Sequence, residues 1–127
     1  MTNIVVTGGS RGIGAAMAER FRKRGDKVRS PGSVDLPVTD PNAVASYFAK
    51  ISTLDLLVCN AGLYLDRGQN LDDGFAADLW DQTMAVNVKG VFLCVQPELP
   101  ALGRAKGKIM IVSSQMASNE RAPGGSY

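Results

Sequence analysis

The chain has 127 residues, of which 45% are hydrophobic and 20% are charged, and its formal net charge is +2. This composition predicts one globular domain with a real core, and the mostly scattered basic residues argue against a nucleic-acid partner. The chain contains no histidine, which excludes Ser-His-Asp and Cys-His nucleophile systems and argues against a metal site.

The cysteines and the hydropathy of the sequence indicate in which cellular compartment the protein is expected. Cys59 and Cys94 lie in apolar runs without a metal-binding or redox spacing, which predicts buried free thiols in a reducing environment. No stretch approaches the length of a transmembrane helix, and no signal peptide is recognised ahead of Ile4. We therefore expect a cytoplasmic protein without a membrane partner.

The chain opens on a strand, a glycine-rich turn and a helix. Residues 4–7 have the composition and length of a strand, and a helical pattern begins at Ile13. The turn between them has glycines at positions 8, 9, 12 and 14. Helix N-terminal N–H groups favour an anion, and glycine lets a phosphate approach the backbone. The pattern predicts a pyrophosphate site of the dinucleotide type. A P-loop is excluded because no Gly-Lys-Ser/Thr ending follows.

The next segment predicts two short strands, a helix and a central strand. Residues 27–29 and 33–36 form the two short strands, with Gly25 as the C-cap of the first helix. A second helix begins at Pro41 with Asp40 as its N-cap. Residues 54–59 form a nearly continuous apolar run, which is typical of a parallel strand covered on both faces.

The remaining chain predicts one long helix and one more strand. A polar loop runs over 64–73, and a helix covers about 76–102, with Pro97 and Pro100 limiting its regular part. Residues 108–112 are expected to form another buried strand, and the rest is polar and loop-like. Alternating strands and helices indicate α/β architecture with a doubly wound, Rossmann-like parallel sheet. Ligands bind such sheets beyond the carboxyl ends of the strands, so Gly8, Asn60 and Ser113 are expected at one crevice.

These motifs together resemble those of the short-chain dehydrogenase/reductase family. The turn Thr7-Gly8-x-x-x-Gly12-Ile13-Gly14 is similar to its cofactor motif, and residues 60–62 are similar to its Asn-Ala-Gly motif. The resemblance implies NAD(P) binding. Asp35 matches the aspartate that contacts the adenine ring in the family, and Asp40 is a rival for that role. The implied cofactor contacts are Gly8, Ser10, Arg11, Gly12, Ile13, Gly14, Asp35, Leu36, Asn60, Ala61 and Gly62.

The resemblance also implies the catalytic residues Asn87, Ser114 and Tyr127. In the family the asparagine holds a water in a proton relay, the serine holds the substrate oxygen, and a tyrosine exchanges a proton with that oxygen. The implied reaction is hydride transfer between a nicotinamide cofactor and a small carbonyl or secondary alcohol. Tyr127 has the family's spacing from Ser114, although residues 124–127 also resemble a branch related to the bacterial C-signal protein, in which the catalytic tyrosine lies just beyond.

The chain departs from the family pattern in two places. The lysine that follows the family's tyrosine is absent from this chain, and the unit between Val28 and Asp35 is unusually short. The sequence covers little more than the first half of a doubly wound fold. We therefore expect residues 1–127 to be the NAD(P)-binding first part of a longer single-domain protein, with a sheet that is incomplete on its C-terminal side.

Cofactor preference, partners and alternative functions can be predicted in part. No acidic residue stands between Lys27 and Ser33, and Arg11 and Arg29 could pair with a 2′-phosphate, which favours NADP over NAD. The helix around 80–95 resembles one that pairs subunits, which implies a homo-oligomer, either a dimer or a tetramer. The alternatives are a nucleotide-binding signalling or scaffold protein without turnover and, less consistent with Asn87 and the serine, a methyltransferase. The substrate stays open.

Overall fold

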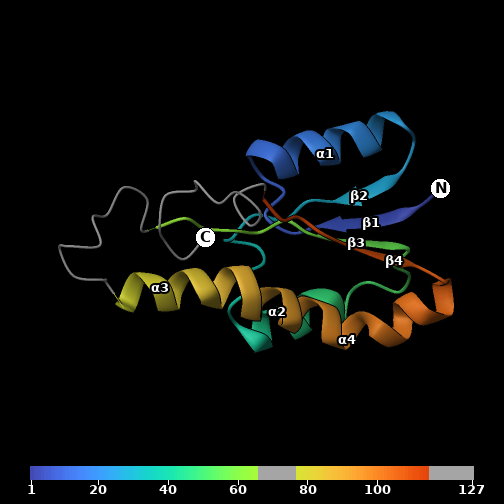
Figure 1. Cartoon of the computed structure of the whole chain (residues 1–127). Coiled ribbons are helices and arrows are strands. Elements are labelled where there is room, and N and C mark those ends of the chain that lie inside the picture. The colour runs from blue at the N-terminus through green and yellow to red at the C-terminus, as the bar shows by residue number, and fades with distance from the viewer. Residues whose placement is uncertain (66–76, 115–127) are drawn as a thin grey trace.

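Strands and helices alternate along the described part of the chain, residues 1–65 and 77–114 of this computed structural model (Figure 1). The elements in chain order are β1 (Asn3–Val6), α1 (Gly12–Lys23), β2 (Lys27–Arg29), α2 (Pro41–Phe48), β3 (Leu56–Cys59), α3 (Ala77–Met84), the π-helical turn η2 (Ala85–Lys89), α4 (Gly90–Ala105) and β4 (Lys108–Ile111).

The four strands form one parallel sheet in the order β2-β1-β3-β4. Ile4 of β1 lies opposite Val28 of β2 on one side and Leu56 of β3 on the other, while Leu57 lies opposite Ile109 of β4. Helix α1 lies on one side of the sheet, and α2 and α4 lie on the other (Figure 1). This arrangement confirms the predicted doubly wound parallel sheet.

The two central strands are buried on both faces because helices pack against each of them. One core cluster includes Val5, Leu57, Phe48 and Leu102, and it fills the space between the sheet and helices α2 and α4. The other cluster consists of Ile4, Val6, Ala18 and Val58, with Met17 and Phe21 packed against it from α1. Burial on both faces explains why β1 and β3 read as continuous apolar runs in the sequence.

The strand predicted at residues 33–36 was wrong. The Leu36 N–H donates a hydrogen bond to the Gly32 carbonyl over 2.9 Å, so this segment turns back on itself and does not join a sheet ladder. The side chains of Leu36 and Val38 are buried in the core, and Pro37 between them has no N–H to donate. Apolar burial therefore fixes this segment without strand pairing.

The prediction that prolines would limit the long helix was also wrong. Helix α4 continues through Pro97 and Pro100 and ends at Ala105, and its C-cap Lys106 has a φ of 51°, in the left-handed region. Both prolines are exposed, so water can reach the carbonyl groups whose helical hydrogen bonds they remove. The predicted single helix of 76–102 is instead divided into α3, η2 and α4.

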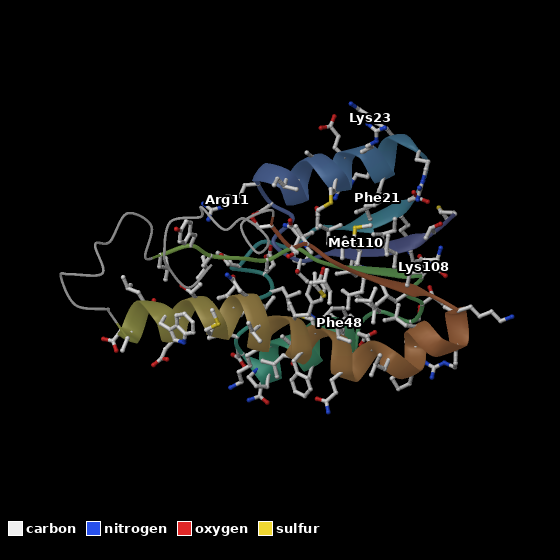
Figure 2. All side chains as sticks on the ribbon, in the orientation of Figure 1. Arg11, Phe21, Lys23, Phe48, Lys108 and Met110 are labelled. Carbon is white, nitrogen blue, oxygen red and sulfur yellow. The ribbon has the colours of Figure 1, made fainter. Side chains whose placement is uncertain are left out.

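Strand β4 was predicted to be buried, and in the structure it is exposed. Ile109, Met110 and Ile111 are 39%, 43% and 58% exposed. Within residues 1–65 and 77–114, β4 pairs only with β3 and has no strand along its other edge. Figure 2 shows the Met110 and Lys108 side chains on this strand. An apolar edge of this kind contrasts with β2, whose edge carries Lys27 and Arg29.

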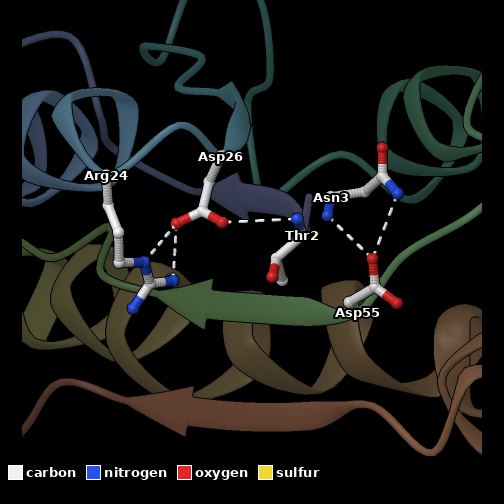
Figure 3. Close-up of polar contacts among 5 residues, drawn as sticks. All are labelled: Thr2, Asn3, Arg24, Asp26 and Asp55. Carbon is white, nitrogen blue, oxygen red and sulfur yellow. Dashed lines mark hydrogen bonds and ion pairs between the residues drawn. The ribbon is translucent and has the colours of Figure 1, made fainter.

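At their amino ends, β1 and β3 are joined by a carboxylate (Figure 3). The Asn3 N–H and side-chain amide donate to Asp55 Oδ2 over 2.7 and 3.1 Å, and these bonds lower the pKa of the Asp55 carboxyl. Because its pKa is lower in the folded than in the unfolded chain, the ionised group favours folding above its unfolded pKa of about 4. This contribution is lost as the pH falls through the folded value.

Replacement of Asp55 by asparagine is therefore expected to lower the free energy of unfolding at pH 7, and the difference from the wild type should shrink as the pH falls below about 4. Urea titrations between pH 7 and pH 2.5 measure this difference. Asp81→Asn, at an exposed position of α3, is the matched control. A difference that is constant across this pH range would contradict the assignment.

Candidate functional site

The turn between β1 and α1 contains two glycines in the left-handed region. Gly8 has a φ of 61° and Gly12 a φ of 57°. A Cβ on Gly8 would lie 2.8 Å from the Ala61 Cα, whereas a Cβ on Gly12 would meet nothing within 4 Å. Gly8 is therefore required both by the backbone conformation and by the close approach of the loop after β3, and Gly12 by its conformation alone.

Helix α1 presents an open N-terminus at this turn. Arg11 at the N-cap is extended and, within the described residues, provides no side-chain cap. The first hydrogen bond runs from the Ala15 N–H to the Arg11 carbonyl over 3.2 Å. The N–H groups of Gly12, Ile13 and Gly14 precede it and have no intrahelical acceptor, so they and the helix dipole favour a bound anion.

One buried hydroxyl connects the glycine turn to the loop after β3. Thr7 Oγ1 accepts hydrogen bonds from the N–H groups of Asn60 and Ala61 over 3.0 and 3.1 Å and donates to the Val58 carbonyl over 3.4 Å. The Asn60 side-chain amide donates in return to the Thr7 and Gly8 carbonyls, both over 3.1 Å. We call these contacts the Thr7–Asn60 clamp.

The clamp explains why position 14 is a glycine, since a Cβ there would collide with the Asn60 amide nitrogen and the Gly8 carbonyl. Sequence analysis included Thr7 in the cofactor motif but assigned it no role in the site. The available signal was a hydroxyl at the end of an apolar strand, because a buried hydroxyl requires partners.

Asn87 lies in the π-helical turn η2 and fixes the next part of the same loop. The Leu63 N–H donates to Asn87 Oδ1 over 2.7 Å, and Asn87 Nδ2 donates to the Leu63 carbonyl over 2.8 Å. This reciprocal pair joins the helix between α3 and α4 to the segment that follows Gly62. Single π-helical turns often occur at functional sites because they alter the local backbone hydrogen bonding.

Two cavities lie at the carboxyl ends of the strands. The first has a volume of about 360 Å³ and includes Gly8, Arg11, Gly12 and Leu36 in its lining. The second has a volume of about 430 Å³ and includes Ile13, Asn87 and Ser114. Both volumes fall within the range of about 300–1,000 Å³ that is common for small-molecule sites.

The two cavities share a wall. Residues Asn60, Ala61, Gly62 and Leu63 line both of them, so the loop held by Thr7 and Asn87 lies between the two spaces. The glycine turn lines the cavity on one side of this loop, and the end of β4 lines the cavity on the other side. Carboxyl ends of parallel strands are where ligands bind in open α/β sheets.

The structure brings together most of the residues singled out in the sequence. Those that line one or both cavities are Gly8, Ser10, Arg11, Gly12, Ile13, Leu36, Asn60, Ala61, Gly62, Asn87 and Ser114.

Other candidate residues lie elsewhere. Asp35 is exposed and does not line either cavity, and its rival Asp40 caps α2 by accepting from the Asn42 and Ala43 N–H groups over 2.9 and 3.2 Å. Arg29 borders a separate hollow of about 40 Å³ with Lys50. Tyr127 lies outside the described residues.

The cysteines near the site are neutral at physiological pH. Burial raises the pKa of the Cys59 thiol to about 11 and that of the Cys94 thiol to about 12. Cys59 lines the second cavity, and as a neutral thiol it is a poor nucleophile. Within the described ranges, no group of three acidic, histidine or cysteine side chains could hold a metal ion, and no helix there is long and apolar enough to cross a membrane.

The sheet, the crossover helices and the position of the cavities define an α/β protein of the Rossmann type. The family model for short-chain dehydrogenases matches residues 32–127, so the chain belongs to this family.

Individual relatives agree with this assignment. The chain is 31% identical to an uncharacterised oxidoreductase of Bacillus subtilis, YxbG, over 87% of this chain and 49% of the relative. It is 28% identical to cis-1,2-dihydrobenzene-1,2-diol dehydrogenase of Pseudomonas putida, with the same coverage of 87% and 49%. The chain thus spans about half the length of the curated relatives it matches. The resemblance to the C-signal branch is not confirmed by these relatives and stays a prediction.

Solved structures share the fold. The ligand-free aldohexose dehydrogenase of Thermoplasma acidophilum superposes with a TM-score of 0.78 at 28% identity, covering 91% of this chain and 50% of that one. A closed form of serine dehydrogenase complexed with NADP+ has a TM-score of 0.80 at 22% identity, covering 95% of this chain and 57% of that one.

The Thr7–Asn60 clamp can be tested by Thr7→Val, which keeps the side-chain shape and removes the hydroxyl. The N–H groups of Asn60 and Ala61 lose their acceptor, and we expect the free energy of unfolding to fall by about 2 kcal/mol. Urea denaturation measures the loss, and Thr53→Val, at an exposed threonine, is the control. Equal stabilities of the two variants would contradict the role of the clamp.

Proposed function

We propose that this chain is the cofactor-binding part of an NAD(P)-dependent oxidoreductase that acts on a small carbonyl or secondary alcohol. The observation that carries the proposal is the pair of cavities across three strand ends, separated by the loop of Asn60–Leu63. In this proposal residues 1–127 are the first part of a longer single-domain protein. Membership of the short-chain dehydrogenase family and the oxidoreductase relatives support it.

The residues present fit a dinucleotide. Gly12 leaves room for a phosphate because a Cβ there would point into open space, and the open N–H groups of α1 would bind the pyrophosphate. The first cavity, with Leu36 and Arg11 in its lining, would hold the adenosine half. The second cavity, beside Ser114, would hold the nicotinamide half.

The bound nicotinamide would supply or accept the hydride, and the chain would position the substrate. Ser114 lines the second cavity, where its hydroxyl would hold the substrate oxygen. The Asn87 side chain makes one hydrogen bond to Leu63 through each of its polar atoms, so a relay water at this residue would bind its second N–H, its second lone pair or the backbone carbonyl. Proton exchange with the substrate oxygen is assigned to Tyr127 or to a tyrosine that follows it in a longer chain.

NADP(H) is the preferred cofactor in this proposal. Arg11 lines the first cavity and lies beside the start of α1 (Figure 2). The segment from Lys27 to Ser33 contains no carboxylate that would repel a 2′-phosphate. The serine dehydrogenase of similar fold was solved with NADP+, which is consistent with this preference.

A titration of NADPH and NADH, followed by nicotinamide fluorescence, tests the proposed function. We expect binding of both, with higher affinity for NADPH, and a loss of at least about tenfold in Gly12→Asp, because its carboxylate would repel the pyrophosphate. Gly12→Asn is the control, because it places a neutral side chain of nearly the same shape at the same left-handed position. If neither cofactor binds the wild type, or if both variants bind equally, the proposal is wrong.

The homo-oligomer is also part of the proposal, and an exposed apolar stripe on the helices supports it. Trp80, Val88, Phe92 and Leu99 are 40%, 60%, 58% and 51% exposed and recur at helical spacing, and exposed apolar residues that share one face mark interaction sites. We expect Phe92→Glu to convert a dimer or tetramer to a monomer in multi-angle light scattering. Gln96→Glu, at an exposed position of the same helix, should leave the mass unchanged. Identical masses for all three proteins would contradict the interface.

A further inference from the structure

We propose that Arg22 determines cofactor specificity: Ser30 holds its guanidinium at the carboxyl end of β2, where it binds the 2′-phosphate of NADP(H). This inference rests on the proposed function and assigns a residue to the preference for NADP(H).

Arg22 lies in the last turn of α1, and its side chain extends along β2. Its Nη2 donates to Ser30 Oγ over 2.7 Å and to the Val28 carbonyl over 3.4 Å. Because β2 runs parallel to β1, its carboxyl end lies near the glycine turn and far from the end of α1. The long side chain therefore carries a positive charge from the helix end to the strand end.

Ser30 lies directly against the glycine turn. The Gly9 N–H donates to the Pro31 carbonyl over 2.9 Å, and a Cβ on Gly9 would lie 2.6 Å from the Ser30 Cβ. A Cβ on Gly32 would lie 2.5 Å from Ser10 Oγ, and Ser10 lines the first cavity. In dinucleotide-binding folds, the residue at the end of the second strand contacts the ribose 2′-hydroxyl, or an arginine nearby accommodates the 2′-phosphate. Ser30 occupies this position.

Two basic residues that follow Arg22 are already paired with carboxylates. Lys23 Nζ pairs with Glu19 over 2.7 Å, and Arg24 pairs with Asp26 through Nε over 2.6 Å (Figure 3). Arg22, in contrast, donates to a hydroxyl and a carbonyl, which are both neutral, and no carboxylate among the described residues lies within ion-pair distance of it.

The charge of Arg22 therefore remains available to a ligand. Its remaining N–H groups can bind two phosphate oxygens at once, as guanidinium groups commonly do. Ser30 also favours NADP(H) over NAD(H), because an acidic residue at this position would pair with Arg22 and repel a phosphate.

The test compares Arg22→Gln with Arg24→Gln by fluorescence titration. The amide that replaces the guanidinium in Arg22→Gln can still donate to Ser30 but lacks the charge, so we expect the Kd for NADPH to rise about tenfold or more, while the Kd for NADH changes less than about twofold. The affinity for adenosine 2′,5′-bisphosphate should fall by the same factor as that for NADPH, and the affinity for adenosine 5′-monophosphate should not change. Arg24→Gln removes a charge of the same kind from the same helix end and should change neither Kd.

A second variant, Ser30→Asp, tests the same site from the strand side. Its carboxylate is expected to neutralise the charge of Arg22. The Kd for NADPH should then rise, while the Kd for NADH stays unchanged or falls. Equal weakening of both cofactors in Arg22→Gln would indicate a structural role and overturn the inference, as would an unchanged Kd for NADPH. Failure of the wild type to bind either cofactor would overturn the proposed function itself, so the two failures are distinguishable.

Discussion

The site depends on one buried hydroxyl. Thr7 terminates β1 and binds both backbone N–H groups that follow β3, while Asn60 returns two bonds to the turn. Adjacent parallel strands end at the same edge of a sheet, and here specific hydrogen bonds also join the loops that follow them. The Thr7–Asn60 clamp holds them so closely that only glycine fits at position 8. The width of the crevice is therefore set by the protein before any ligand binds.

The clamp belongs to a longer chain of contacts that reaches the helical layer. The loop beyond Asn60 continues to Leu63, whose backbone is bound by the Asn87 amide in η2. The same loop separates the two cavities, so its position determines the shape of both. Each bond of this chain joins a side chain to backbone groups, and the Asn60 side chain contributes two of them from within the loop itself.

The sequence predicted the centre of the fold well because its signals there are local. β1, α1, α2 and β3 followed from hydrophobic periodicity and capping, and Asp40 caps α2 as predicted. The errors occurred where tertiary context decides the outcome: residues 33–36 are held by buried side chains without strand pairing, and α4 tolerates two exposed prolines. The exposure of β4 depends on which elements flank it, and an apolar run carries no information about that.

In the candidate site, too, the sequence predicts the residues with local signals and misses those that depend on tertiary contacts. The glycine turn and the Asn60 loop were predicted to meet because parallel strand ends meet, and the structure places them together. Asp35 was assigned by its neighbours in the sequence, and the turn that replaces the predicted strand leaves its side chain exposed and outside the lining of both cavities. The partners of Thr7 are distant in the sequence, and Arg22 reaches the strand end only through its long side chain. Local sequence patterns reveal neither contact.

The most direct test of the account is a map of backbone amide shifts in the 15N-labelled chain during titration with NADPH. If the crevice at the strand ends is the cofactor site, the amides of Gly8–Gly14, Asn60–Leu63 and Ser113–Ser114 should shift together with one dissociation constant. Shifts confined to the opposite end of the sheet, around Asn3, Asp55 and Lys108, or independent shifts of the glycine turn and the Asn60 loop, would contradict it.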